Sequence, residues 1–447
     1  MEVVPRDVAF AVARMEGYNS NVFRLETNGA TSAGPNSIIT MSLPSNAVID
    51  LRSFKVHLDV LTTLDDTTAN TIYGKLPADS ASLIQSCEVY CGGIQIAQGF
   101  SEFNTVSRVK KLIYSNRDRE SSIDQTLYHG IISADNAVDA VSMIFKPNIG
   151  FFAETSTRYL PTSILGDVSV RLTLAPNSVL AYKEEVIAPG GNFSSAMARL
   201  AAQSISYSVL SIHATIATCT LGAMYETMLL DRLGQEEYLA INFKEYYTFG
   251  LHGTNSTAHD VRFSLSASSI DRIYTICRDA NYQSAGIKTQ TYTGATLTDS
   301  NCSNFLHFKS YNDSFTTRGS LRYQYQVNNV QHPQFHADCL DAAHELLMVS
   351  DGHGNSGRGN MITSLQDWNN GKAIVPLQLS MPGQPVNVMA GYNSRGNNTQ
   401  FSVSISGQTM PPINIDAQVS GRISTLVIVE TTAQLRISGA KQVSVSY

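Results

Sequence analysis

Histidine and cysteine are the residue types here that could bind a metal ion, with ten and six copies in the chain. His332 and His336 are four positions apart, the spacing that places two ligands on one face of a helix. Pro333 lies between them and disfavours a helix, so we expect a surface loop there. Cys87 and Cys91 are also four apart, but no second pair at zinc-finger spacing accompanies them. We predict no metal ligand, and we expect reduced, mostly buried cysteines.

Known catalytic patterns are also missing from the sequence. The glycine-rich stretch at 352–360 lacks the lysine of a phosphate-binding loop, and no G-x-S-x-G nucleophile elbow occurs. The acidic pairs Glu184-Glu185 and Glu236-Glu237 consist of adjacent residues. Adjacent side chains on a strand point to opposite faces, so neither pair can readily converge as an acid and a base. We predict no catalytic residue, no cofactor and no enzymatic activity.

A basic cluster, Arg108, Lys110 and Lys111, falls on a helix expected over Phe103–Ile113. It could face packaged nucleic acid or a membrane, but a solvated helix face is the simpler interpretation. The net charge of −6 argues against sequence-specific nucleic-acid binding. We find no secretion signal and no apolar stretch long enough to span a membrane. For that reason we expect no conventional glycosylation at the five Asn-X-Ser/Thr triplets, which begin at residues 192, 255, 301, 312 and 397.

The elements around these residues are mostly β-strands. The chain has 447 residues, of which 43% are apolar and only 15% charged, so it has ample core material and a surface of low charge. Apolar residues occupy every second position in Asp50–Thr62, Val168–Leu174 and Ile205–Thr218, the pattern of half-buried strands. Short helices are expected at Phe103–Ile113, Met224–Leu233 and Ala337–Val349.

Two stretches resemble each other and suggest an internal duplication. In Leu76–Tyr90 and in Phe263–Arg278, a small polar segment of Ser, Ala and Asp leads into a strand. Each half of the chain contains about eight strands and at least one helix, which is the strand count of a jelly roll. We predict an all-β fold of two consecutive eight-stranded jelly-roll sandwiches, a double jelly roll, with short helices and long loop insertions.

The domain limits follow from clusters of turn residues. Ala175–Ser195 contains Pro-Asn and Pro-Gly-Gly breakers and is the best boundary. We predict an N-terminal arm with the first strand (1–35), an N-terminal jelly roll (36–188), a linker (189–203) and a C-terminal jelly roll (204–447). An insertion is expected in the last of these, at about 281–370.

The order of several short elements resembles the major capsid proteins of small eukaryotic double-stranded DNA viruses, the Polinton-like virus and virophage group. The likeness covers roughly residues 40–280 and 400–447, and no single motif in it is as specific as a metal or nucleotide signature. The matching elements are Leu76-Pro77, Ser82-Leu83-Ile84 with the hairpin glycines after it, Leu174 to Leu180 closing the first jelly roll, Ser269 to Ile273, Tyr325 to Asn329, and the last eleven residues.

The resemblance implies a structural protein. Its subunit would form a homotrimer, a pseudo-hexameric capsomer that tiles an icosahedral virion shell. Its partners would be further copies of itself, a penton protein and minor capsid proteins, and the chain would be assembled inside the host cell rather than secreted. The alternative from another class is a carbohydrate-binding or carbohydrate-active protein on paired jelly rolls. The single Trp argues against sugar stacking, whereas the 20 Tyr residues keep it open.

Overall fold

A computed structural model gives the fold, and it describes most of the strands and helices. The described residues are 19–64, 72–76, 79–97, 102–114, 140–184, 205–220, 223–236, 238–254, 258–279, 308, 321–351, 368, 372–381, 386, 388–396, 399–407, 423–438 and 442–447. The glycine-rich stretch, the loop excursion at 115–139 and most of the predicted insertion lie outside them.

The first sandwich consists of two antiparallel sheets. Its outer sheet has the strand order β1-β11-β3-β7, with the short β8 added beside β3, and its inner sheet has the order β2-β9-β5-β6. The bounds are β1 Asn19–Glu26, β2 Ile38–Ser42, β3 Val48–Leu64, β5 Ile84–Cys91, β6 Ile94–Ala97, β7 Val141–Phe145, β8 Tyr159–Pro161, β9 Val168–Leu174 and β11 Ile205–Thr220. The strands β4 (Ile72–Lys75) and β10 (Ala181–Glu184) pair separately.

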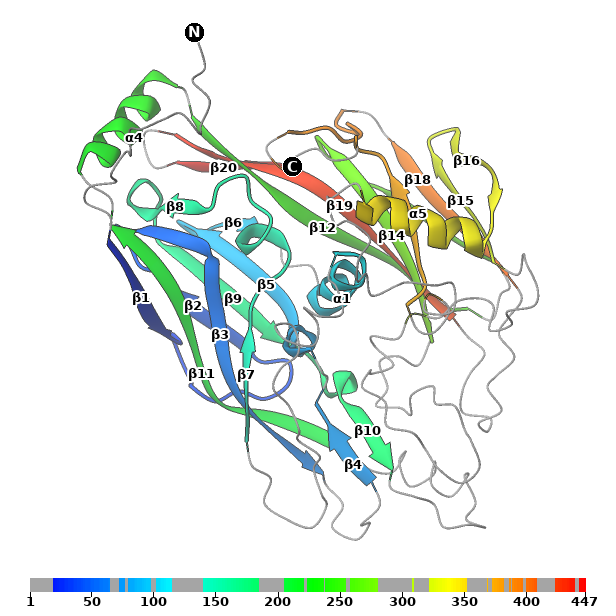
Figure 1. Cartoon of the computed structure of the whole chain (residues 1–447), viewed down its shortest axis with the longest axis horizontal. Coiled ribbons are helices and arrows are strands. Elements are labelled where there is room, and N and C mark those ends of the chain that lie inside the picture. Colours follow the sequence, from blue (N-terminus) through cyan, green and yellow to red (C-terminus); the bar gives the residue numbers. More distant parts are fainter. Residues whose placement is uncertain are drawn as a thin grey trace, which may run out of the picture.

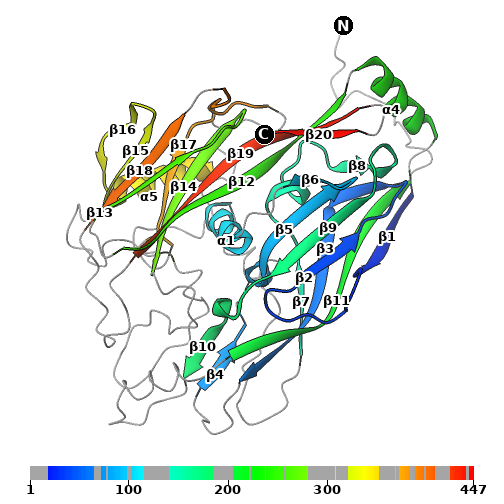
Figure 2. The same ribbon diagram turned by 180° about the vertical axis from the view of Figure 1, so that it is seen from behind.

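The second sandwich repeats this architecture. Its inner sheet has the order β12-β19-β14-β17, with β20 beside β19, and its outer sheet has the order β13-β18-β15-β16. The bounds are β12 Leu239–Thr254, β13 Ala258–Ser264, β14 Ile270–Asp279, β15 Arg322–Val327, β16 Val330–Ala337, β17 Ile374–Gln378, β18 Gln400–Ser406, β19 Ile423–Ile437 and β20 Val443–Ser446. In Figures 1 and 2 the four sheets lie one after another, with the two inner sheets facing each other across a helix.

Strand order establishes the duplication. If the eight main strands of each half are numbered along the chain, both halves have one sheet in the order 1-8-3-6 and one in the order 2-7-4-5. This is the jelly-roll arrangement, in which the last strand returns beside the first. The predicted double jelly roll is therefore confirmed. In each half a helix lies between the fifth and sixth strands, α1 (Phe103–Tyr114) in the first and α5 (Cys339–Asp351) in the second.

The two stretches that resemble each other in sequence do not occupy equivalent positions in the two sandwiches. The two similar stretches belong to β5 and β14, the fourth strand of one sandwich and the third of the other. The likeness therefore joins non-equivalent strands. It reflects a shared local pattern, a small polar turn before a buried strand.

Two of the predicted limits also divide sheets that are continuous. Strand β11 was assigned to the start of the second jelly roll, but it pairs with β1 and β3 as the eighth strand of the first. That strand, rather than Leu174 to Leu180, closes the first sandwich. The limit at residue 36 likewise separates β1 from the sheet to which it belongs. Alternation shows that a strand is half-buried but does not identify its partners, and these partners are about 150 to 200 residues away.

In both sandwiches the core is formed by the alternating apolar residues that predicted the strands. In β9 the residues Val168, Val170, Leu172 and Leu174 are buried and those between them are half-buried. The sandwiches join in one continuous hydrophobic core that crosses their boundary. A third helix, α4 (Ala223–Gln235), connects β11 to β12 at the end of the molecule near the C-terminus (Figure 1).

The burial of one side of β11 can be tested by truncating that side. We expect Ile212→Ala, at a side chain 1% exposed, to lower the free energy of unfolding by about 2–5 kcal/mol in urea titrations, because it opens a cavity between the sheets. Leu210→Ala, at a side chain 47% exposed on the same strand, is the control and should change it by about 0.5 kcal/mol or less. Equal effects would contradict the packing of this side of β11 in the core.

Candidate functional site: the buried charge cluster between the sandwiches

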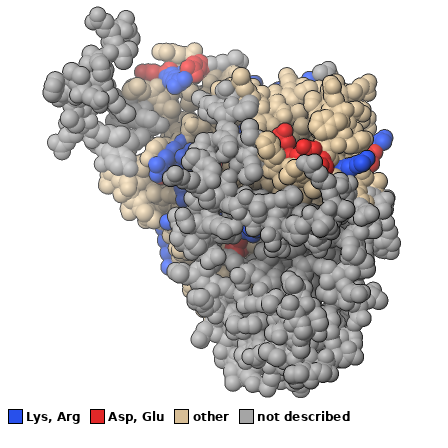
Figure 3. Space-filling model, turned by 45° about the vertical axis from the view of Figure 1, so that its right-hand side comes forward, with Lys and Arg blue, Asp and Glu red and all other residues tan. Residues whose placement is uncertain are grey.

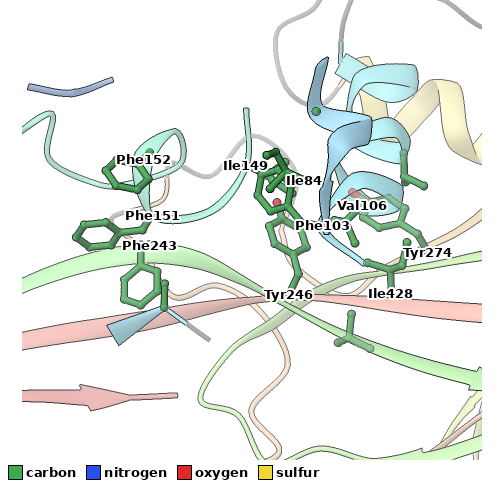
Figure 4. Packing of buried hydrophobic residues seen from close by; sticks show 14 of the residues in the cluster. Ile84, Phe103, Val106, Ile149, Phe151, Phe152, Phe243, Tyr246, Tyr274 and Ile428 are labelled. Carbon is green, nitrogen blue, oxygen red and sulfur yellow. The ribbon is translucent and has the colours of Figure 1, made fainter. Parts of the chain in front are cut away.

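Helix α1 lies at the boundary of the two sandwiches and is buried on nearly all sides. Nine of its twelve residues are buried, among them the polar Asn104, Thr105 and Ser107. A helix buried all round belongs to the core rather than to the surface. Figure 4 shows this boundary, with side chains from both sandwiches: Phe103 and Val106 of α1, Phe151 and Phe152 from the first sandwich, and Phe243, Tyr246, Tyr274 and Ile428 from the second.

Six charged side chains meet at this boundary, three cations and three carboxylates. Glu430 of β19 is at their centre and is 1% exposed. Its Oε2 lies 2.9 Å from Lys110 Nζ of α1, and its Oε1 lies 3.1 Å from an Arg272 nitrogen and 3.7 Å from Lys244 Nζ. The remaining two carboxylates complete the cluster: Lys110 is 3.3 Å from Glu154, and Lys244 is 2.7 Å from Asp271.

The electrostatics keep Glu430 and Lys110 charged. Burial alone would raise the pKa of Glu430, but Lys110, Arg272 and Lys244 together hold that pKa well below its ordinary value. Burial alone would lower the pKa of Lys110, but Glu154 and Glu430 raise it above its ordinary value. The opposing shifts have one cause, since each partner favours the charged form of the other.

Tyrosines enclose the cluster. Tyr246 donates a hydrogen bond to Glu154 at 2.5 Å, Tyr274 donates to Glu430 at 3.2 Å, and the Tyr114 and Tyr274 hydroxyls lie 3.2 Å apart. Lys110 Nζ also lies 4.3 Å from the centre of the Tyr114 ring, within cation–π range. Burial, together with Glu430 and, for Tyr246, Glu154, raises the pKa of Tyr246 and Tyr274 well above the ordinary value. These phenols remain neutral donors.

A second ion pair crosses the boundary at the other end of α1. The side chain of Arg278 on β14 is fully buried and donates to both carboxylate oxygens of Glu102, at 3.0 and 2.8 Å, and to the Thr105 hydroxyl at 3.2 Å. Nη2 makes both bonds to Glu102 and Nη1 makes the bond to Thr105, so two nitrogens of the guanidinium are held in place by charge-assisted hydrogen bonds. Glu102 immediately precedes α1, so this pair holds the N-terminal end of the helix, whereas Lys110 holds its last turns.

The arrangement can orient two sandwiches but has no features of a reactive site. Its charges balance in number, its phenols are neutral, and Lys110 is only 5% exposed. Misplacing one buried charge would leave its partners uncompensated, which costs several kcal/mol. The cluster therefore favours one relative position of the two sandwiches.

The structure corrects two of the interpretations of charged and histidine residues. Lys110 and Lys111 do not form a solvated helix face: Lys110 belongs to the buried cluster, and Lys111 pairs with Asp79 at 2.9 Å. His332 and His336 lie on strand β16 rather than in a loop. Glu236 is paired with Arg232 four residues earlier, whereas Glu185 and Glu237 lie outside the described residues.

Sequence reasoning missed the cluster because its members are scattered from residue 110 to residue 430. The one local signal was the lysine pair on the amphipathic helix. Among the described residues, no group of three or more His, Cys, Asp or Glu side chains could hold a metal ion. Burial, with Glu88 and Glu245, raises the pKa of the Cys87 thiol to about 12, so it is not a reactive thiolate at neutral pH. No helix in the described part of the chain has the length and hydropathy needed to cross a membrane.

Comparison with known proteins gives results at the level of structure only. No family model and no curated protein matches the sequence. Solved structures do match over nearly the whole chain. A chain of the PBCV-1 virus capsid is 14% identical, with 98% of each chain covered and a TM-score of 0.59.

Two further solved structures match with similar identity, coverage and TM-score. A chain of the Sputnik virophage is 11% identical, with 100% of this chain and 92% of that one covered and a TM-score of 0.57. The Faustovirus major capsid protein is 9% identical, with 98% and 93% covered and a TM-score of 0.59. The chain has their double jelly-roll fold. At this identity the double jelly roll is what the likeness establishes, and the strand orders above establish it independently.

The contribution of the charge cluster to the free energy of unfolding can be measured by neutralising Glu430 at its centre. We expect Glu430→Gln to lower the free energy of unfolding by about 3–5 kcal/mol in urea, because three buried cations then face two carboxylates. Asp260→Asn, which breaks an exposed pair with Arg262 on the outer sheet, is the control and should cost about 1 kcal/mol or less. Similar losses in the two variants would contradict the structural role of the cluster.

The lowered pKa of Glu430 also predicts an acid dependence. A carboxyl group with a lower pKa in the folded state than in the unfolded state contributes stability that is fully present above about pH 4.5. That contribution is lost as the pH falls toward the folded-state pKa. We expect the urea midpoint of the wild type to fall more steeply between pH 5 and pH 3 than that of Glu430→Gln. Parallel curves would contradict this prediction.

Proposed function

We propose that this chain is a major capsid protein, a structural and non-catalytic subunit that forms trimers and, through them, the shell of an icosahedral virion. The observation that carries the proposal is the double jelly roll itself: two sandwiches of identical strand order held in one fixed orientation. Three such chains present six similar units, which suits the corners of a hexagonal tile. Two of the matched structures, from the PBCV-1 virus capsid and the Faustovirus major capsid protein, are named as capsid proteins, and this supports the role for the present chain.

The way in which the sandwiches meet inside one chain suggests how copies meet. Within the chain, a sheet of order 2-7-4-5 faces a sheet of order 1-8-3-6. The sheets left on the outside are again one of each type, the outer sheet of the first sandwich and the outer sheet of the second (Figures 1 and 2). Placing the outer sheet of one copy against the opposite outer sheet of the next repeats the internal relation, and three copies close a ring.

The composition of the outer sheets fits such contacts. On the outer sheet of the second sandwich, the outward positions of β18 and β15 are Gln400, Ser402, Ser404, Ser406, Arg322, Gln324 and Gln326. On the side of the molecule seen in Figure 3, charged side chains of described residues form small separate groups. Depletion of charge is typical of interface cores, and a stable trimer should bury more than roughly 2,000 Å² in its contacts.

The connections of the fold differ between its two ends. Those after the third, fifth and seventh strands are long, at 65–83, 98–140 and 175–204 in the first sandwich and 280–321, 338–373 and 407–422 in the second. At the other end the turns after the second and fourth strands are short, at 43–47, 92–93, 265–269 and 328–329, and only the connections after the sixth strands are longer, at 146–167 and 379–399. Long connections tolerate change and carry recognition, so we propose that their end faces outward. A penton protein and minor capsid proteins remain expected partners within the virion.

The carbohydrate-binding alternative gains no support from the chain's single tryptophan. Trp368 is fully buried, and its indole donates a hydrogen bond to the Ile374 carbonyl at 3.0 Å. It cannot stack on a sugar.

The proposal is tested by the mass and outline of the purified full chain. Light scattering after size-exclusion chromatography should give three times the chain mass of 48.6 kDa, and negative-stain images should show near-hexagonal particles or closed shells. Ser404→Arg and Ile144→Arg, on the two outer sheets, should give folded monomers, because each places a charge in the proposed contact. Met228→Arg, at an exposed residue of α4, is the control and should stay trimeric. A stable wild-type monomer at micromolar concentration would refute the proposal.

A further inference from the structure

Two histidines lie against each other on the outward face of the outer sheet of the first sandwich. His57 of β3 and His213 of β11 are direct cross-strand partners. Their rings are stacked face to face, with centroids 4.6 Å apart and planes inclined by only 2°. Both are half-buried in the single chain, and His57 Nε2 lies 3.2 Å from the Thr215 hydroxyl. The cross-strand register thus brings together two imidazoles, the side-chain type that serves most often as a pH switch in proteins.

The strands on either side supply the charges nearest to the pair. Cross-strand partners point to the same side of a sheet, so the neighbours follow from the register. The row through the pair reads Glu26, His213, His57, Ile144 across β1, β11, β3 and β7, and the rows beside it contain Arg24, Thr215 and Lys55 on one side and Ser211, Asp59 and Ser142 on the other.

The three rows around the pair are electrically balanced only while both rings are neutral. Their two cations, Arg24 and Lys55, equal their two carboxylates, Glu26 and Asp59. Arg24 binds Glu26 at 2.6 Å, and Asp59 accepts a hydrogen bond from Ser142 at 2.6 Å. Further along β3, Asp50 is paired with Arg158, and Arg52 is exposed. Burial, His213, Lys55 and Arg24 lower the pKa of His57, against a smaller opposite effect of Asp59. Protonation of the pair would therefore place two like charges in contact and change the charge of these rows from 0 to +2.

The opposite outer sheet would not compensate that charge. Its outward positions contain Arg262 and Arg322 but only one carboxylate, Asp260, so its balance is already positive by one. The edge strand β16 adds two more histidines, His332 and His336, and no carboxylate. Protonation of the His57–His213 pair would therefore set a positive region of one outer sheet against an outer sheet that is itself positive.

We propose that the His57–His213 pair makes the contact between neighbouring copies of this chain pH-sensitive, stable while both rings are neutral and weakened when they take up protons. The inference rests on the proposed trimer. Contact with another copy would bury the rings further, so the separated chain binds protons more readily than the trimer does. Proton uptake then favours separation, and the trimer loses stability as the pH falls below about 6.5. With such a contact, a shell that is stable at neutral pH would become less stable in an acidic compartment.

The test compares assembly of the full chain at several pH values. For the wild type, the protomer concentration at half-assembly should rise roughly tenfold or more between pH 7.5 and pH 5.5, measured by light scattering, because at least one linked proton gives a factor of ten per pH unit. His57→Gln/His213→Gln should remain trimeric over the same range, since glutamine keeps a polar planar group without the charge. His344→Gln, at an exposed histidine of α5, is the control and should behave as the wild type.

The outcomes separate this inference from the proposed function. A wild type that is trimeric at pH 7.5 and equally trimeric at pH 5.5 overturns the pH-sensitive contact and leaves the capsid role intact. The pH-sensitive contact is also overturned, with the capsid role intact, if the variant His57→Gln/His213→Gln dissociates at pH 5.5 as the wild type does. A wild type that is monomeric at pH 7.5 overturns the trimer, and with it this inference. Circular dichroism at both pH values, unchanged, excludes unfolding as the cause of dissociation.

Discussion

The compensation of Glu430 by Lys110, Arg272 and Lys244 is the interaction on which the relation of the two sandwiches depends. An apolar boundary alone would hold the sandwiches together but would tolerate small sliding motions, because hydrophobic contact has no preferred direction. Buried ion pairs differ, since a displacement of an ångström or two leaves charges without partners in a region of low dielectric. The cluster thus fixes one orientation of the two sandwiches, which hydrophobic contact alone would not do. The Arg278–Glu102 pair adds the same constraint at the other end of α1.

That orientation determines what the proposed trimer can be. If the sandwiches could shift, the six units of its ring would not be equivalent and the ring would not close. The internal contact joins a sheet of one type to a sheet of the other, and the outer sheets have the same combination of types. A duplicated fold with a rigid junction therefore contains in one chain half of the geometry that the proposed six-membered ring needs, and self-association would supply the other half.

The sequence predicted local structure well and long-range partners poorly, for one physical reason. Alternation in Val168–Leu174 and in the strand around His213 reports burial of one face, which is a property of the strand alone. The pairing of β11 with β1 and β3 depends on residues far away in the chain, and no local pattern contains it. The same holds for Lys110. On its helix it looks like a solvent-exposed lysine, and only the return of β19, 320 residues later, makes it a buried cation.

Because the outer sheets have few charges, each titratable group on them has a large effect on the local electrostatic potential. On a surface crowded with lysines and glutamates, a pair of histidines would change the local potential little, because neighbouring charges would screen it. The outward positions of the outer sheets are instead largely Ser, Thr and Gln, with few charges among them. If copies of the chain associate through these sheets, as proposed above, their association is therefore sensitive to the ionisable pairs that remain. On the outer sheet of the first sandwich that pair is His57 and His213, brought together by the same strand β11 that closes the first jelly roll.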